Sequence, residues 1–168
     1  MKEKVFREDS KYKYLLFSIV ITGLSYGLYK GMLDNFLVEV VGMGEFDKGV
    51  TEFFRELPGI MLVFILAAFH MMSAETLYKA GALIMLVGMG MHAILPATKI
   101  FATLAICTYS LGEHIQLGMK SSISLNYAKE GRGGQALGAQ NAMSQIGTLV
   151  GYLVIVVVFS ILVKKSAL

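Results

Sequence analysis

The sequence predicts an all-α membrane protein with about five transmembrane helices, because its composition does not fit a soluble domain of this length. Hydrophobic residues make up 55% of the 168 residues and charged residues only 16%. The mean hydropathy is +0.63. The charges cluster between apolar runs of about 20 residues, the length that crosses a hydrocarbon core about 30 Å thick. Backbone amides in lipid must be paired within the chain, so these runs are expected to be helices.

The chain is expected to begin with a cytoplasmic segment, residues 1–13, that is polar and rich in basic residues. The first span follows at about 14–36. Three glycines repeat at every fourth position of this span, a spacing that lets another helix pack closely: Gly23, Gly27 and Gly31.

Four further apolar runs are expected to cross the membrane. They lie at about 53–72, 77–95, 100–119 and 138–163. The connections between them are expected to be an exterior loop at 37–52, short turns at 73–76 and 96–99, and a polar link at 121–137. Residues 164–168 form a short tail.

A multi-pass protein of the cell membrane, a cell inner membrane, is expected, and the distribution of basic residues predicts a cytoplasmic N-terminus. In this orientation more lysines and arginines lie on the inner side than on the outer side. No cleavable signal peptide is evident. The net charge of +3 resides near the spans, so the expected partner is the lipid bilayer and its anionic headgroups rather than nucleic acid.

The main candidate site is a polar stretch inside the fourth apolar run. Glu113, Gln116 and Lys120 share one helical face, whereas His114 points about 100° away from Glu113. Ionisable groups inside a membrane usually face a protein interior or water. One hypothesis makes this face a substrate cavity in which Glu113 or His114 exchanges a proton. In the alternative, Glu113 pairs with a basic group of another helix and only holds the bundle together.

The first span supplies a second polar line, Tyr26, Lys30 and Asp34. Tyr26 and Lys30 are further substrate-site candidates. Lys30 and Asp34 have the spacing of an intrahelical salt bridge. The alternative is an extracellular gate formed with the start of the second span, whose candidates are Asp34, Asn35, Arg55 and Glu56.

Glycine motifs around the fifth run carry a family resemblance. The link contains R-x-G-x-x-x-G at Arg132, Gly134 and Gly138, and the run itself contains G-x-x-x-G at Gly147 and Gly151. Together with G-L-S-Y-G-L-Y-K-G-M-L-D-N in the first run, these positions resemble the N-terminal half of major facilitator superfamily (MFS) transporters, over about residues 14–163.

This resemblance implies part of a six-helix bundle and secondary active transport of a small solute by alternating access, with proton coupling as a candidate mechanism. Such transporters have two six-helix halves. The chain is therefore expected to be a fragment, completed by missing C-terminal helices, a partner subunit or a homo-oligomer. The chain departs from the family pattern in two places. The link between the second and third runs has only Glu75 and Lys79 as charged residues. The fourth run has Glu113 and His114 where many members have an arginine.

A small multi-pass assembly or regulatory subunit without transport activity is the alternative function. An enzyme is not expected, because no nucleophile, base or metal ligands converge at a useful spacing. No cofactor and no metal are expected, since His70, His92 and His114 are predicted at different membrane depths.

Overall fold

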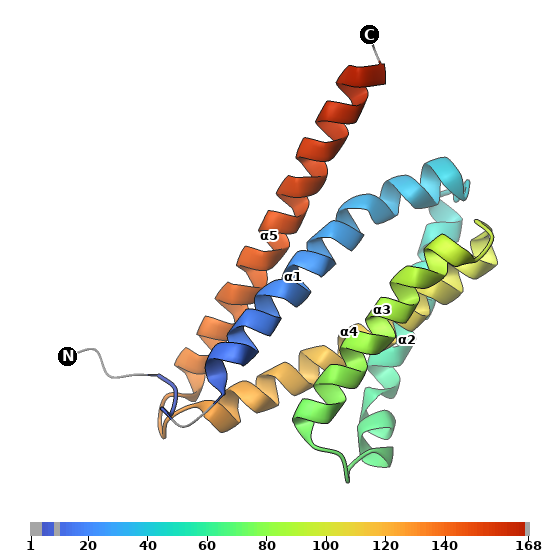
Figure 1. The fold of residues 1–168 in the computed structure, drawn as a ribbon. Coiled ribbons are helices and arrows are strands. Elements are labelled where there is room, and N and C mark those ends of the chain that lie inside the picture. Colours follow the sequence, from blue (N-terminus) through green and yellow to red (C-terminus); the bar gives the residue numbers. More distant parts are fainter. Residues whose placement is uncertain (1–4, 9–10, 167–168) are drawn as a thin grey trace. The chain divides into compact units, whose positions relative to one another are not determined.

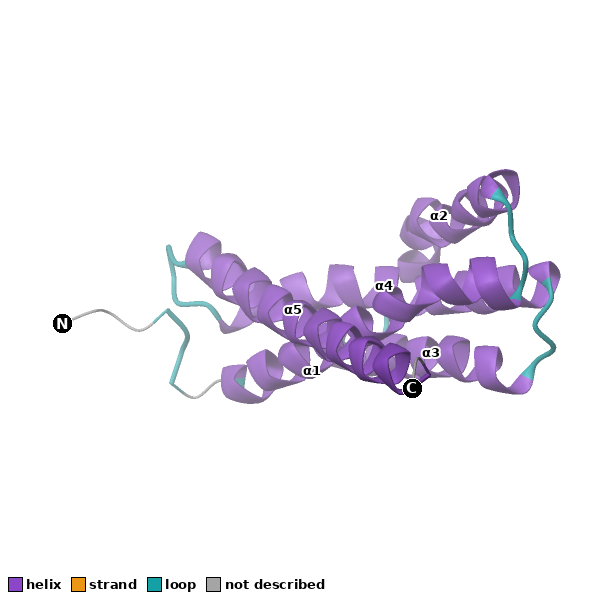
Figure 2. Cartoon of the chain, turned by 90° about the horizontal axis from the view of Figure 1, so that it is seen from above, coloured by secondary structure: helices purple, strands orange, loops and turns teal. Residues whose placement is uncertain are grey.

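The computed structural model describes residues 5–8 and 11–166, and side chains as far as residue 161. Parts of the predicted segments 1–13 and 164–168 thus lie outside the described residues. Those described form five α-helices and a short π-helical turn, so the expectation of an all-α chain is confirmed (Figures 1 and 2). The elements are α1 (Tyr12–Asn35), η1 (Phe36–Val40), α2 (Glu45–Ala68), α3 (Ala74–Ile94), α4 (Lys99–Tyr127) and α5 (Gly133–Ser166).

Within the described residues, three segments are long and apolar enough to cross a membrane, which indicates a membrane protein. They are Tyr12–Val40, Ala74–Ile94 and Gly133–Ile161. The other two helices, α2 and α4, carry more of the charged and polar side chains, as described below.

Two segments expected to be loops are largely helical, so those expectations are wrong. Within 37–52, the helix α2 already begins at Glu45, because Gly44 caps it and its amide donates to Asp47 Oδ2 at 3.0 Å. Within 121–137, only residues 128–132 separate α4 from α5. Hydropathy locates the apolar part of a helix, whereas backbone hydrogen bonds continue into polar residues beyond it.

The chain divides into two units. Unit 1 comprises the described residues of 1–34 and 124–168, and is built on the close packing of α1 and α5. A Cβ atom on Gly23 or Gly27 would overlap the backbone of Ser144 or Thr148. A Cβ atom on Gly147 or Gly151 would in turn overlap the α1 backbone. Contacts further along α1 also lie further along α5, so the two helices are parallel. Gly31 lies further along the same face, against the side chains of Tyr152 and Ile155.

The N-terminal segment of unit 1 pairs with the link between α4 and α5. Phe6 forms an isolated antiparallel bridge with Ala128, and the Lys129 amide donates to the Val5 carbonyl at 2.9 Å. The Phe6 ring is buried and stacks on Tyr12 with a centroid distance of 4.8 Å. These contacts hold the start of the chain against the link.

Unit 2, residues 35–123, contains α2, α3 and most of α4. Here α4 contributes most of the buried apolar side chains, including Ala105, Ile106 and Tyr109. Its contact with α3 depends on glycines, because a Cβ on Gly81 would lie 2.8 Å from the Gly112 carbonyl oxygen. The helix α4 is therefore the core of this unit, and it contacts both α3 and α2.

Candidate functional site between α2 and α4

Polar residues and one glycine form a continuous contact between α2 and α4, which we call the α2–α4 seam. The participating residues recur at intervals that keep them on one face of each helix. They are Asp47, Thr51, Arg55, Glu56 and Gly59 on α2, and Lys99, Thr103, Ser110 and His114 on α4. Contacts that lie further along α2 also lie further along α4, so the two helices run parallel.

The first half of the seam holds an ion pair and a hydroxyl pair. Lys99 Nζ donates to Asp47 Oδ2 at 2.7 Å. This hydrogen bond is the main reason that the pKa of Asp47 lies below its ordinary value. The hydroxyls of Thr51 and Thr103 lie 2.9 Å apart, and Thr51 is buried.

The second half of the seam orients an imidazole. The Ser110 hydroxyl donates to the Arg55 carbonyl oxygen at 2.6 Å, so its own oxygen is left as an acceptor. His114 Nδ1 lies 3.1 Å from this hydroxyl and 2.9 Å from the Ser110 carbonyl oxygen, which makes Nδ1 the protonated nitrogen. In the neutral ring, Nε2 then carries the lone pair. It faces Glu56 Oε2 at 3.7 Å and packs against Gly59.

Arg55 lies at the centre of a charge network. It contacts Glu52 at 2.5 Å and Glu56 at 2.6 Å, both on α2 itself. Of the four gate candidates, Arg55 and Glu56 are thus paired, whereas Asp34 and Asn35 are exposed. Within the part of the chain that the structure describes, no ion pair joins Lys30 to Asp34.

Glu113 and Gln116 take different surroundings on α4. Glu113 is half-buried with its Oε2 atom in the interior, and its charge is attracted to Arg55 and Lys120. Gln116 is 3% exposed and donates from Nε2 to the Tyr78 carbonyl oxygen on α3 at 3.2 Å. Glu113 therefore belongs to the charge network near α2, whereas Gln116 ties α4 to α3.

The remaining candidates lie in unit 1. Tyr26 and Lys30 are half-buried on α1. Arg132 directly precedes α5 and donates from Nη1 to Gln135 Oε1 at 2.9 Å. Gly134 and Gly138 lie in the first turns of α5 and face open space, because a Cβ atom added to either would have nothing within 4 Å.

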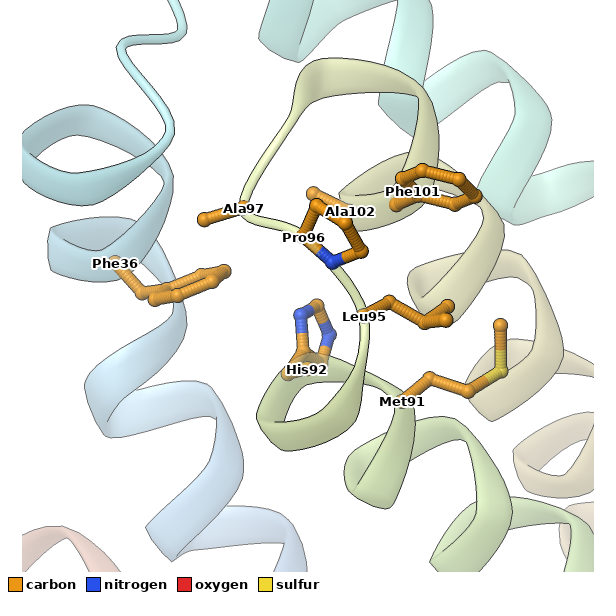
Figure 3. Close-up of a pocket in the computed structure, with 8 residues that line it drawn as sticks. All are labelled: Phe36, Met91, His92, Leu95, Pro96, Ala97, Phe101 and Ala102. Atoms are coloured by element: carbon orange, nitrogen blue, oxygen red, sulfur yellow. The ribbon is translucent and has the colours of Figure 1, made fainter.

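A small hollow lies where α3 turns into α4 (Figure 3). Its volume of about 10 Å³ leaves room for about one water molecule. The Phe36 ring meets the His92 imidazole edge to face there, with centroids 5.2 Å apart. This hollow is too small for a solute.

Sequence reasoning missed several members of the seam. Glu52 was a recognisable partner of Arg55, because the two residues are three positions apart on one helix. On α2, Thr51 and Gly59 carried a weaker signal, the four-residue repeat that they form with Asp47 and Arg55. On α4, Thr103 lies four residues after Lys99, and Ser110 lies four residues before His114. The approach of His114 to Glu56 left no signal in the sequence, because it depends on how the two helices pack.

Comparison with protein-family models, with curated proteins and with solved structures gives no match to this chain. Among the described residues, no group of three or more histidine, cysteine, aspartate or glutamate side chains is arranged to hold a metal ion.

Proposed function

We propose that the chain is the helical bundle of a secondary active transporter, which moves a small solute by alternating access in the manner of the major facilitator superfamily. In this proposal all five helices cross the membrane, including α2 and α4. Alternating access requires a second bundle, supplied by further helices, a partner subunit or a second copy.

The observation that carries the proposal is the placement of ionisable groups on the two less apolar helices. Arg55, Glu56, Glu113 and His114 gather where α2 meets α4, and Glu113 and His114 lie in the middle of a 29-residue helix. Such groups inside a membrane are costly and usually border a route for a solute or proton. A bundle held together only by apolar packing has no need of them.

The two ring nitrogens of His114 meet different partners in the seam. Because Ser110 orients Nδ1, a second proton binds at Nε2, which faces Glu56 at 3.7 Å. The resulting imidazolium attracts Glu56 and competes with Arg55 for its carboxylate. Protonation thus changes which charges are paired across the seam, and a change of this kind can bias two arrangements of the helices.

The test combines a ligand screen with transport. Small solutes that raise the unfolding temperature of the purified protein identify ligands, because a ligand stabilises the state it binds. Uptake of each ligand is then measured in proteoliposomes under a pH gradient. We expect uptake with the wild type, and loss of uptake or of its response to the gradient with Glu113→Gln.

Glu39→Gln is the matched control, since Glu39 is an exposed carboxylate of η1. It is expected to transport like the wild type. Normal, gradient-dependent uptake with Glu113→Gln would remove Glu113 from the mechanism. Absence of any solute binding and uptake would favour an assembly or regulatory subunit instead.

A further inference from the structure

Unit 2 contains a groove of about 480 Å³ between the N-terminal halves of α2 and α4. This volume falls in the range of about 300–1,000 Å³ that is usual for ligand sites. The Asp47–Lys99 ion pair lines the end nearest the N-termini of the two helices, and Thr51, Thr103 and Cys107 also line the groove. Six large apolar side chains line the rest: Met43, Phe46, Val50, Phe54, Ile100 and Leu104.

The apolar walls are strongly exposed. Phe46 is 84% exposed and Ile100 79% exposed, so the described residues leave these walls uncovered. From Asp47 to Phe54 the groove follows α2 for seven residues, or about 10 Å at 1.5 Å per residue. Apolar, exposed walls that follow the helix suit part of an apolar chain lying along α2.

At the polar end, the Asp47 carboxylate and the Lys99 ammonium can each form further hydrogen bonds. Lys99 Nζ and the Gly44 amide both bond to Asp47 Oδ2, and the described residues place no donor on Oδ1. Lys99 has three N–H donors, and its side chain is 52% exposed. The N-termini of α2 and α4 also lie at this end, and helix N-termini attract anions. This end of the groove thus offers one site for a cation beside one for an anion.

We propose that this groove binds a membrane phospholipid whose headgroup carries a primary ammonium beside the phosphate. The phosphate accepts from Lys99, the ammonium donates to Asp47 Oδ1, and one acyl chain lies between Phe54 and Leu104. A quaternary ammonium has no N–H and cannot make the bond to Oδ1. The site therefore distinguishes phosphatidylethanolamine from phosphatidylcholine. This lipid site is independent of the proposed transport.

Cys107 reports on the occupancy of the groove, because it lines the groove and is the single cysteine of the chain. The experiment measures the rate at which a small maleimide alkylates Cys107 in detergent micelles, while phosphatidylethanolamine or phosphatidylcholine with the same acyl chains is added. Bound lipid slows the reaction. We expect phosphatidylethanolamine to give half-maximal protection at a concentration about tenfold lower than phosphatidylcholine does. This ratio is typical of one charged hydrogen bond.

Three variants separate the headgroup contact from general effects. Lys99→Ala is expected to raise the concentration needed for protection about tenfold, since it removes one charged hydrogen bond. Glu45→Gln is the matched control, because the Glu45–Lys48 pair of 2.9 Å is close by but outside the groove lining. Val50→Trp fills the groove and is expected to abolish the effect of lipid while the helical circular dichroism signal persists.

Equal protection by the two lipids, or unchanged protection with Lys99→Ala, would overturn the proposal. Protection that grows with protein concentration in the absence of lipid would assign the groove to a second copy of the chain and would likewise overturn it.

Discussion

Adding one methyl group at the contact between α1 and α5 is expected to weaken unit 1. The Cβ of Gly147→Ala would overlap the Val20 carbonyl oxygen and lie 2.9 Å from the Leu24 amide nitrogen. Both neighbours are backbone atoms, so no side chain can rotate away and the helices must separate towards ordinary contact distances of about 3.5–4.0 Å. Overpacking of this kind typically costs about 1–3 kcal/mol.

Gly138→Ala on the same helix is the control, because a Cβ there meets nothing within 4 Å. Both substitutions gain about 1 kcal/mol of helix propensity, so the difference between them isolates the packing term of about 1–3 kcal/mol. The assay is reversible unfolding in mixed micelles, followed by circular dichroism as the fraction of denaturing detergent rises. Equal free energies of unfolding for the two variants would refute the close packing of α1 and α5.

Two further predictions concern the seam. Gly59→Ala would place a Cβ 2.5 Å from His114 Nε2, so the imidazole is expected to turn away from α2 and its NMR resonances are expected to shift. Gly49→Ala is the control, because its Cβ has open space around it, and it is expected to leave these resonances unchanged. The hydrogen bond from Lys99 holds the pKa of Asp47 below its ordinary value. The ionised carboxylate of Asp47 therefore stabilises the folded protein above about pH 4, and this stabilisation is lost as the pH falls through the pKa of the folded state. The unfolding temperature should therefore drop on acidification below about pH 4 more in the wild type than in Asp47→Asn, and equal pH profiles would contradict this.

The helices were largely predictable, but their ends were not. Apolar runs locate the helices because they reflect which residues avoid water. The end of a helix depends on local hydrogen bonds, and α4 continues to Tyr127 through polar residues that hydropathy assigns to a loop. The start of α2 did have a signal, since Gly44 followed by Asp47 three positions later fits a helix cap.

The candidate site was predictable in its residue types but not in its pairings. Glu113, His114 and Arg55 stand out because charges are rare in apolar runs. A helical wheel places Glu113 and Gln116 on one face, yet Gln116 bonds to α3 whereas Glu113 is attracted to Arg55. Which neighbour each side chain meets is set by the packing of three helices, and one sequence does not contain that information.

In the proposed transporter, the polar face of α4 borders an aqueous route. This placement is tested most directly by thiol accessibility in sealed vesicles, with single-cysteine variants made in a Cys107→Ser background. Glu113→Cys is expected to react with a charged, membrane-impermeant thiol reagent. Leu117→Cys, at a position 46% exposed on the outer surface of the unit, is expected to remain unreactive in lipid. Reaction of Leu117→Cys without reaction of Glu113→Cys would contradict this placement.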